Sequence, residues 1–256
     1  IDGRLRLTDW NTINFSDDNW PCASIIPKEE HPKGRLVNQD QPPIRIIRTY
    51  DGQLIHSVNN RRIFDLSQNI SAILELEVKG KTGDKVIIYP SEKLDEKGDV
   101  DQMAKNWNLI DNVITYVVGK DDEWEQFSQV FTYFAGRYLG IDSTCEIRNI
   151  KGHAITSATK NDGHFTCDNE CYNKIYDMIE KTVEANMMSV HTDCPTIERF
   201  AWQEPNHLMA PSIMYMKDVK KLWTKFLNDM RVSQHDKEDF FFDYQGNKIF
   251  PGDGLM

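Results

Sequence analysis

The spacing of apolar residues changes once along this chain, near Gly163, and the change divides the chain into two parts. Before it, apolar and polar residues alternate in short runs. In one such run Leu74, Leu76 and Val78 would share one face of a strand. After it, apolar residues recur at steps of three and four, which is the period of an amphipathic helix. We therefore predict a mixed fold in which a strand-rich region precedes a helical one.

The alternating part predicts a series of short strands separated by Gly- and Asp-containing turns. The predicted strands cover residues 44–50, 63–66, 72–78, 85–89, 113–118, 125–131 and 137–141. Strands at this spacing are typical of a β-sandwich, and we assign residues 36–150 to such a domain. Within it, Asp65, Gln68 and Asn69 favour a turn over a sugar site.

Two helices are predicted after the change of period. The first runs from about residue 169 to 188, with Asp168 as its N-cap and an apolar stripe that faces the core. The second runs from Leu208 to Met230, and Pro211 would suit its first turn. Two helices cannot bury their apolar faces alone, so the sheet or further chain must cover them.

The segment between the two predicted helices holds the residues with the clearest chemical potential. Asp193, Glu198 and Glu204 supply carboxylates, and a planar cation and a flat apolar surface come from Arg199 and Trp202. Acids transfer protons, charged groups bind hydroxyls, and an aromatic face covers the apolar side of a sugar ring. The residues alone leave two interpretations open, a sugar site or a surface loop with solvated charges.

This segment resembles the signature of the bacterial α-L-rhamnosidases, glycoside hydrolase family 78. The family pattern is Thr-Asp-Cys-Pro, a short spacer, Glu-Arg, Leu-Gly-Trp and then an acidic residue. Here Phe200-Ala201 replaces Leu-Gly, and the spacer before Glu198 is one residue shorter than in many members. The resemblance covers nearly the whole chain, in pieces that include Thr192-Asp193-Cys194-Pro195, Pro42-Pro43-Ile44-Arg45, Ser91-Glu92-Lys93-Leu94-Asp95, Phe131-Thr-Tyr-Phe134 and Gly163-His-Phe-Thr-Cys167.

The resemblance implies an architecture and a reaction. Residues 1–35 would be the tail of a preceding jelly-roll domain with a linker. The β-sandwich of residues 36–150 would follow, and residues 151–256 would be the first part of an incomplete (α/α)6 catalytic barrel. The reaction would be inverting hydrolysis of terminal α-L-rhamnosyl residues from glycosides or polysaccharides. The general base would lie outside this chain, so we expect the chain to be inactive alone.

The resemblance also assigns roles to the site residues. Glu198 would be the catalytic acid, and Asp193 would bind rhamnose hydroxyls with Arg199 and Trp202 as supporting contacts. Glu204 is the weaker candidate for substrate binding, and the shortened spacer leaves open whether Glu198 or Glu204 is the acid. Two alternatives stay open, a non-catalytic carbohydrate-binding or structural fragment and another (α/α)6-barrel glycosidase.

The composition of the chain argues against several classes of binding partner. The 256 residues have a net charge of −10, which argues against a nucleic-acid partner because phosphate binding needs clustered Lys and Arg. No apolar run reaches the roughly 18 residues of a membrane span, so no membrane partner is expected. The five cysteines lack the spacing of metal ligands, and we expect neither a metal nor a cofactor. The oligomeric state stays undetermined, and a periplasmic or extracellular location would suit polysaccharide breakdown.

Overall fold

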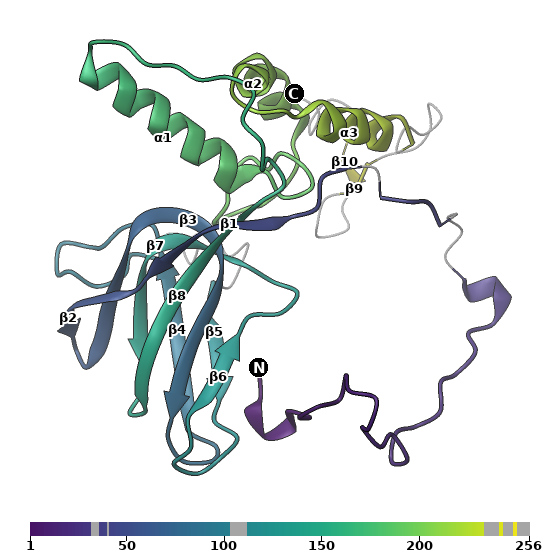
Figure 1. Ribbon diagram of the computed structural model, residues 1–256, viewed down its shortest axis with the longest axis vertical. Coiled ribbons are helices and arrows are strands. Elements are labelled where there is room, and N and C mark those ends of the chain that lie inside the picture. Colours follow the sequence, from purple (N-terminus) through teal and green to yellow (C-terminus); the bar gives the residue numbers. More distant parts are fainter. Residues whose placement is uncertain (32–35, 40, 103–111, 233–240, 243–247, 250–256) are drawn as a thin grey trace.

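The computed structural model describes residues 1–31, 36–39, 41–102, 112–232, 241–242 and 248–249 (Figure 1). Its strands are β1 (Arg45–Asp51), β2 (Gln53–Val58), β3 (Arg61–Lys79), β4 (Lys85–Ser91), β5 (Ile114–Val117), β6 (Glu125–Ser128), β7 (Phe134–Asp142) and β8 (Glu146–Thr156). Its helices are α1 (Glu170–Asn186), α2 (Gln203–Met216) and α3 (Lys220–Val232), followed by the short strands β9 (Phe241–Phe242) and β10 (Lys248–Ile249). The helices lie over one end of the sheet (Figure 1). The predicted order, strands first and helices after, is confirmed.

A single long strand, β3, gives the sheet its curl. The first half of its 19 residues pairs with β2 and β7, and its second half pairs with β8 and β6. Between the halves the register shifts from Asp65 to Ile70. There Ser67 has a left-handed φ of 65°, and its N–H donates to Asp65 Oδ1 at 2.6 Å. Such irregularities bend a strand, and the turn role predicted for Asp65 is confirmed.

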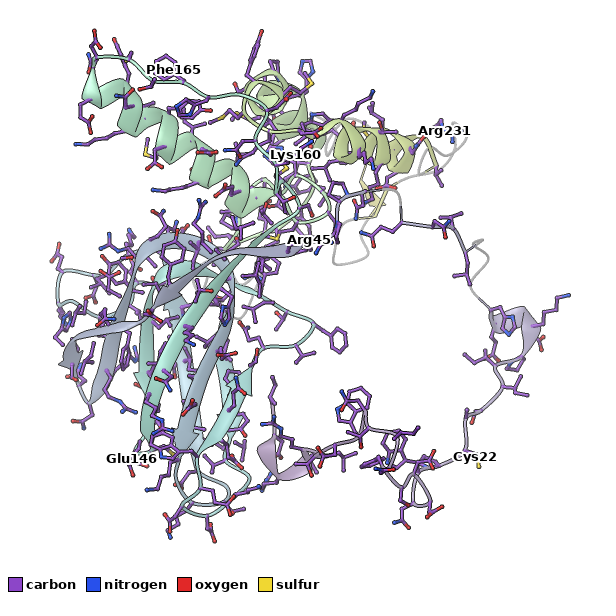
Figure 2. All side chains as sticks on the ribbon, viewed as in Figure 1. Cys22, Arg45, Glu146, Lys160, Phe165 and Arg231 are labelled. Atoms are coloured by element: carbon purple, nitrogen blue, oxygen red, sulfur yellow. The ribbon has the colours of Figure 1, made fainter. Side chains whose placement is uncertain are left out.

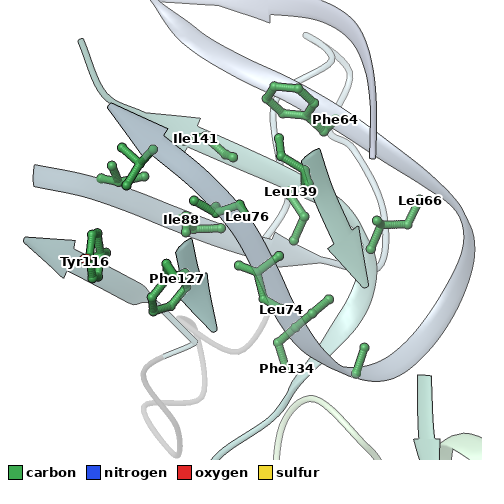
Figure 3. Packing of buried hydrophobic residues seen from close by; sticks show 14 of the residues in the cluster. Phe64, Leu66, Leu74, Leu76, Ile88, Tyr116, Phe127, Phe134, Leu139 and Ile141 are labelled. Atoms are coloured by element: carbon green, nitrogen blue, oxygen red, sulfur yellow. The ribbon is translucent and has the colours of Figure 1, made fainter. Parts of the chain in front are cut away.

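The sheet encloses its own hydrophobic core (Figure 3). Along β3, Leu74, Leu76 and Val78 are fully buried, whereas Glu75 and Glu77 are partly exposed. This confirms the predicted alternation, because successive side chains of a strand point to opposite faces. Side chains of β4, β6 and β7 share this core, and they include Ile88, Phe127, Phe134, Leu139 and Ile141.

Of the eight strands β1–β8 of the main sheet, the sequence analysis located six and missed two. Each predicted segment overlaps an observed strand, and residues 63–66 and 72–78 both belong to β3. The missed strands are β2 and β8. Nearly all residues of β2 are exposed, so no buried face marks it in the sequence. β8 continues past residue 150 to Thr156 and pairs with both β1 and β3.

The helices differ from the prediction at their ends. The N-cap of α1 is Asn169 and not Asp168, because the Asn169 side chain accepts the N–H of Cys171 at 3.0 Å. α2 begins at Gln203, so Pro211 lies inside this helix and not in its first turn. The predicted helix over residues 208–230 was wrong, since the chain forms two helices there.

The break between α2 and α3 comes from a tertiary contact. Lys217 has an extended backbone, with φ −130° and ψ 142°, and forms a β-bridge with Asn161. The N–H of Asp218 donates to Lys160 O at 2.9 Å. Pairing with the segment that leads from the sheet to α1 therefore replaces helical hydrogen bonds, although the apolar spacing continues through the break.

The second hydrophobic cluster joins the three helices to the end of the sheet. Its buried members are Ala158, Val183, Met187, Ile213, Met216, Val219 and Leu222. The stripe of α1 is buried only toward its C-terminal end, because Tyr172 and Ile175 are exposed. This corrects the expectation that the whole stripe faces a core.

In the described part of the chain, no helix has both the length and the apolar character of a membrane span.

The described part of residues 1–44 runs outside both clusters, and Figure 2 shows Cys22 well away from the sheet. It contains two short 3-10 helices, η1 (Gly3–Leu5) and η2 (Lys28–Glu30). Asp2 forms a parallel bridge with Val117 of β5. The jelly-roll tail and linker assigned to residues 1–35 stay a prediction, and residues 32–35 lie outside the described residues.

Gly163 provides a first test of how the helices are held. A Cβ at this position would lie 1.8 Å from the backbone oxygen of Tyr215 in α2. We expect Gly163→Ala to lower the free energy of unfolding by about 1–3 kcal/mol, because backbone must move to admit the methyl group. Urea unfolding followed by circular dichroism measures the change. An unchanged midpoint would show that this segment moves away from α2 without cost.

Candidate functional site

The loop between α1 and α2, residues 187–202, is called the signature loop below. Asn186 holds its start, because its backbone oxygen accepts the N–H of Thr192 at 2.8 Å and its Oδ1 accepts the Thr192 hydroxyl at 3.0 Å. Asp193 closes the loop. Its N–H donates to Phe200 O at 2.9 Å, and its Oδ1 accepts the N–H of Phe200 at 3.2 Å. The loop is therefore a closed turn with a fixed shape.

Glu198 and Trp202 are in direct contact inside this turn. The indole Nε1 of Trp202 donates to Glu198 Oε2 at 2.6 Å, which fixes the orientation of the carboxyl group. The N–H of Glu198 donates to Cys194 Sγ at 3.2 Å. The ring of Phe200 meets the Trp202 ring edge-on, with 5.4 Å between centroids. A carboxylate beside a partly exposed indole is a pair of groups suited to a sugar ring.

Arg199 connects the signature loop to the sheet. Its Nε donates to Pro195 O at 2.8 Å and its Nη1 to Tyr133 O at 3.0 Å, and the guanidinium lies 4.3 Å from the centre of the Tyr133 ring. Burial lowers the pKa of Arg199 and raises the pKa of Tyr133, while the Arg199 charge opposes the shift at Tyr133. Arg199 also has a left-handed φ of 59°. These contacts stabilise the loop, and a sugar contact of Arg199 stays a prediction.

Glu204 takes no part in the contacts that link the other predicted site residues. It is exposed in the first turn of α2, where the helix N-terminus favours a negative charge. Among the described residues, it forms no hydrogen bond or ion pair with Asp193, Glu198, Arg199 or Trp202. The structure therefore joins Glu198 to Trp202, places Asp193 and Arg199 in the same turn, and leaves Glu204 at the surface.

The sheet adds residues that the sequence analysis did not assign to the site. Glu92, just after β4, accepts the Thr196 hydroxyl at 3.4 Å with Oε2 and the Asn69 side-chain amide at 2.9 Å with Oε1. Tyr133 contacts Arg199, as described above. The sequence did mark these two residues, since Glu92 and Tyr133 lie in segments that resemble the family. Nothing in the sequence placed them beside the signature loop.

Buried polar groups support the two ends of the signature loop. Burial lowers the pKa of His191, so its ring is neutral near pH 7, and it packs edge-on against Trp223 at 6.4 Å. Asn206 in α2 donates to the backbone oxygen of Trp202 at 2.5 Å. Within the described ranges, no three His, Cys, Asp or Glu side chains form a group that could hold a metal ion.

The fold and the loop define a class of site. An oriented carboxyl group, a second carboxylate and an indole face lie together in a closed turn between two helices, supported by a curled sheet. Such a set can transfer a proton to a sugar oxygen and contact a sugar ring. Both functions belong to proteins that process carbohydrates.

Comparison with known proteins identifies the family. The bacterial alpha-L-rhamnosidase concanavalin-like domain matches residues 55–158, and the bacterial alpha-L-rhamnosidase 6 hairpin glycosidase domain matches residues 160–247. The chain belongs to the bacterial alpha-L-rhamnosidase family. The two matches meet between β8 and α1, where the apolar period changes.

Relatives in sequence and structure agree with this family. An alpha-L-rhamnosidase of Formosa agariphila is 25% identical over 90% of this chain and 25% of its own length. The solved alpha-L-rhamnosidase of Dictyoglumus thermophilum has a TM-score of 0.82 at 28% identity, covering 92% of this chain and 27% of that one. The Streptomyces avermitilis enzyme complexed with L-rhamnose has a TM-score of 0.69 at 25% identity, covering 78% and 20%. The chain thus spans about a quarter of the length of these relatives.

Proposed function

We propose that this chain is part of an α-L-rhamnosidase that hydrolyses terminal α-L-rhamnosyl residues of glycosides or polysaccharides with inversion. The observation that carries the proposal is the contact between Glu198 and Trp202 in the signature loop, within a region that matches the glycosidase domain of the family. The Streptomyces avermitilis relative was solved with L-rhamnose, which supports rhamnose as the sugar recognised.

Each site residue has a proposed role. Glu198 donates a proton to the leaving oxygen, and Trp202 holds the carboxyl group through its indole N–H while its ring contacts the sugar. Asp193 accepts hydrogen bonds from rhamnose hydroxyls, and Arg199 supports that contact. Glu204, at the surface of α2, is the weaker candidate for substrate binding.

The second carboxylate of the reaction lies outside these residues in our proposal. An inverting enzyme needs a base roughly 6.5–9.5 Å from the acid, so that a water molecule fits between them and the sugar. We propose that further chain supplies this base. The curled sheet would then be the β-sandwich domain predicted for residues 36–150, which β8 extends to Thr156. The helices, which begin with α1 at Glu170, would be the first part of an (α/α)6 barrel that further helices complete.

A product analysis tests this proposal directly. The protein at the length of its relatives is incubated with an aryl α-L-rhamnoside, and the first-formed anomer of rhamnose is identified by proton NMR. Inversion predicts β-L-rhamnose as the initial product, before mutarotation. Initial release of the α-anomer would exclude the inverting mechanism. Absence of any rhamnose release, with sugar binding retained, would instead support a non-catalytic carbohydrate-binding protein.

The 256-residue chain alone is expected to release no measurable rhamnose from the same substrate. The reason is that loss of a catalytic group typically lowers the rate by about 10²–10⁴-fold or more. Hydrolysis by the purified chain, compared at equal concentration with the longer protein, measures the difference. Rates within tenfold of each other would place the base inside this chain, and the carboxylates Asp193, Glu204 and Glu92 would then be tested in turn.

A further inference from the structure

We propose that Lys217 is a positioning residue for the signature loop. Its buried ammonium group cross-links α1 to α2, which are the two helices that the loop connects. Lys217 touches none of the groups assigned to catalysis, and it would act by fixing the separation of the helices. The effect that we expect on enzymatic activity rests on the proposed function. The effect that we expect on the geometry of the signature loop does not.

The ammonium of Lys217 is almost completely enclosed. Its side chain is 1% exposed, and Nζ donates to Asn161 Oδ1 at 2.6 Å, Glu180 Oε1 at 2.9 Å and Glu184 Oε1 at 2.8 Å. These three acceptors match the three N–H donors of an ammonium group. A buried charge is costly unless it is paired and hydrogen-bonded, so the position specifies a cation of this shape.

The network also reaches the sheet and is electrically neutral. Arg48 of β1 forms an ion pair with Oε2 of Glu184, while Lys217 takes Oε1. Two cations therefore face the two carboxylates of Glu180 and Glu184. Because Glu184 contacts both cations, one side chain joins β1, α1 and the end of α2.

The two flanks of the signature loop both depend on this cross-link. Glu184 stands in the last turn of α1, two residues before Asn186, which holds Thr192 beside Asp193. On the other flank, α2 begins directly after Trp202 and ends next to Lys217. A helix is stiff over this length, so the cross-link sets the gap that the loop spans. The gap in turn sets the contact between Trp202 and Glu198.

The backbone around Glu184 is fixed to the sheet at the same point. Ser71 of β3 donates its hydroxyl to Ala185 O at 2.6 Å, and the N–H of Ser157 donates to Met187 O at 2.7 Å. The end of α1 is therefore held by the sheet, whereas the end of α2 is held by the backbone bridge to Asn161 and by the Lys217 ammonium, which alone links it to the α1 carboxylates Glu180 and Glu184 in the described contacts. Loss of the ammonium should displace α2 and Trp202 and leave α1 in place.

The test uses Lys217→Met, which keeps the length of the side chain and removes its charge. The readout is the indole N–H resonance of Trp202 in a ¹H–¹⁵N spectrum of this chain, assigned with Trp202→Phe. We expect the resonance to shift or broaden in the folded protein, because its 2.6 Å hydrogen bond to Glu198 changes. We also expect Tm to fall by about 10 °C, since an unpaired charge is left buried.

Lys160→Met is the matched control. Lys160 precedes Asn161 of the network in the sequence, and its side chain is 77% exposed. Its Nζ forms an ion pair with Asp218 Oδ2 at 3.2 Å. The same change of charge there should leave the Trp202 resonance unchanged and shift Tm by no more than about 2 °C. An equal shift of the Trp202 resonance in both variants would overturn the assignment to Lys217.

A compensating variant separates positioning from stability. Lys217→Met with Glu184→Gln leaves Arg48 and Glu180, so the local charge returns to zero while the cross-link stays absent. Tm should therefore recover in part, whereas the Trp202 resonance should stay shifted. If Lys217→Met does not fold, Glu180→Gln removes one acceptor charge and should shift the resonance by a smaller amount. A lowered Tm with an unchanged Trp202 resonance would show a purely structural role and overturn the proposal.

In the protein at the length of its relatives, Lys217→Met should lower kcat for rhamnoside hydrolysis about tenfold with KM nearly unchanged, because small displacements of a proton donor are costly. A moved resonance with unchanged kcat would overturn the link to catalysis. A wild-type protein without rhamnosidase activity would contradict the proposed function, and the NMR result would still decide the role of Lys217 in the loop.

Discussion

Glu198→Gln is expected to lower kcat/KM for natural rhamnosides by about 10²–10⁴-fold in the protein at the length of its relatives, because the leaving oxygen would lose its proton donor. Gln keeps the shape of Glu and can still accept the hydrogen bond of Trp202, so the loop should keep its structure. The loss should be much smaller, about tenfold, for an aryl rhamnoside with a very acidic phenol, since that leaving group needs little protonation. Steady-state kinetics on both substrates measures the difference.

Two further variants act as controls for this experiment. Asp193→Asn should weaken hydrolysis of both substrates by a similar factor, because it removes a contact used in either reaction. Glu204→Gln should change neither rate strongly, since Glu204 is exposed on α2 and is not a hydrogen-bond partner of the Glu198 carboxyl group. If Glu204→Gln shows the dependence on the leaving group and Glu198→Gln does not, Glu204 is the acid.

Leu76→Ala is expected to lower the free energy of unfolding by about 3–5 kcal/mol, the largest effect on stability that we predict. Leu76 is fully buried in the second half of β3, where β6 pairs with the strand on one side and β8 on the other. The truncated side chain leaves a cavity that a sheet paired on both edges cannot close. For a chain of this size the change corresponds to a fall in Tm of roughly 6–20 °C. Thermal unfolding followed by circular dichroism measures it.

Leu54→Ala in β2 is the matched control for this variant. It removes the same atoms from a strand of the same sheet, but Leu54 is 58% exposed. Its effect should stay within about 0.5 kcal/mol, as for most surface substitutions. Equal effects of the two variants would contradict the location of the core inside the curl of β3.

The sequence by itself determined the order of the elements and the chemistry of the signature loop. Alternation in residues 74–78 identified the buried face of β3, because a strand with one buried face must repeat every second residue. Recurrence at three and four residues identified α1. The residue types Asp193, Glu198 and Trp202 by themselves left open a sugar site and a solvated surface loop, and the resemblance to the family signature favoured the sugar site.

Other elements carry too little local signal to be predicted. β2 is exposed on both faces and shows no period, so only its pairing with β3 defines it. The break between α2 and α3 is invisible in the apolar spacing, because it arises from the bridge between Lys217 and Asn161, which are 56 residues apart in the chain. Local propensities cannot report contacts at such a separation.

Only the tertiary structure decided which predicted site residues contact one another and which do not. In the fold, the guanidinium of Arg199 donates hydrogen bonds to the backbone oxygens of Pro195 and Tyr133, and Glu204 is exposed at the surface. The fold also brought Glu92, which follows β4 of the sheet, to Thr196 of the signature loop. The physical reason is that spacing fixes which residues share a turn or a face, whereas hydrogen-bond partners depend on which distant segments the packed core brings within about 3 Å.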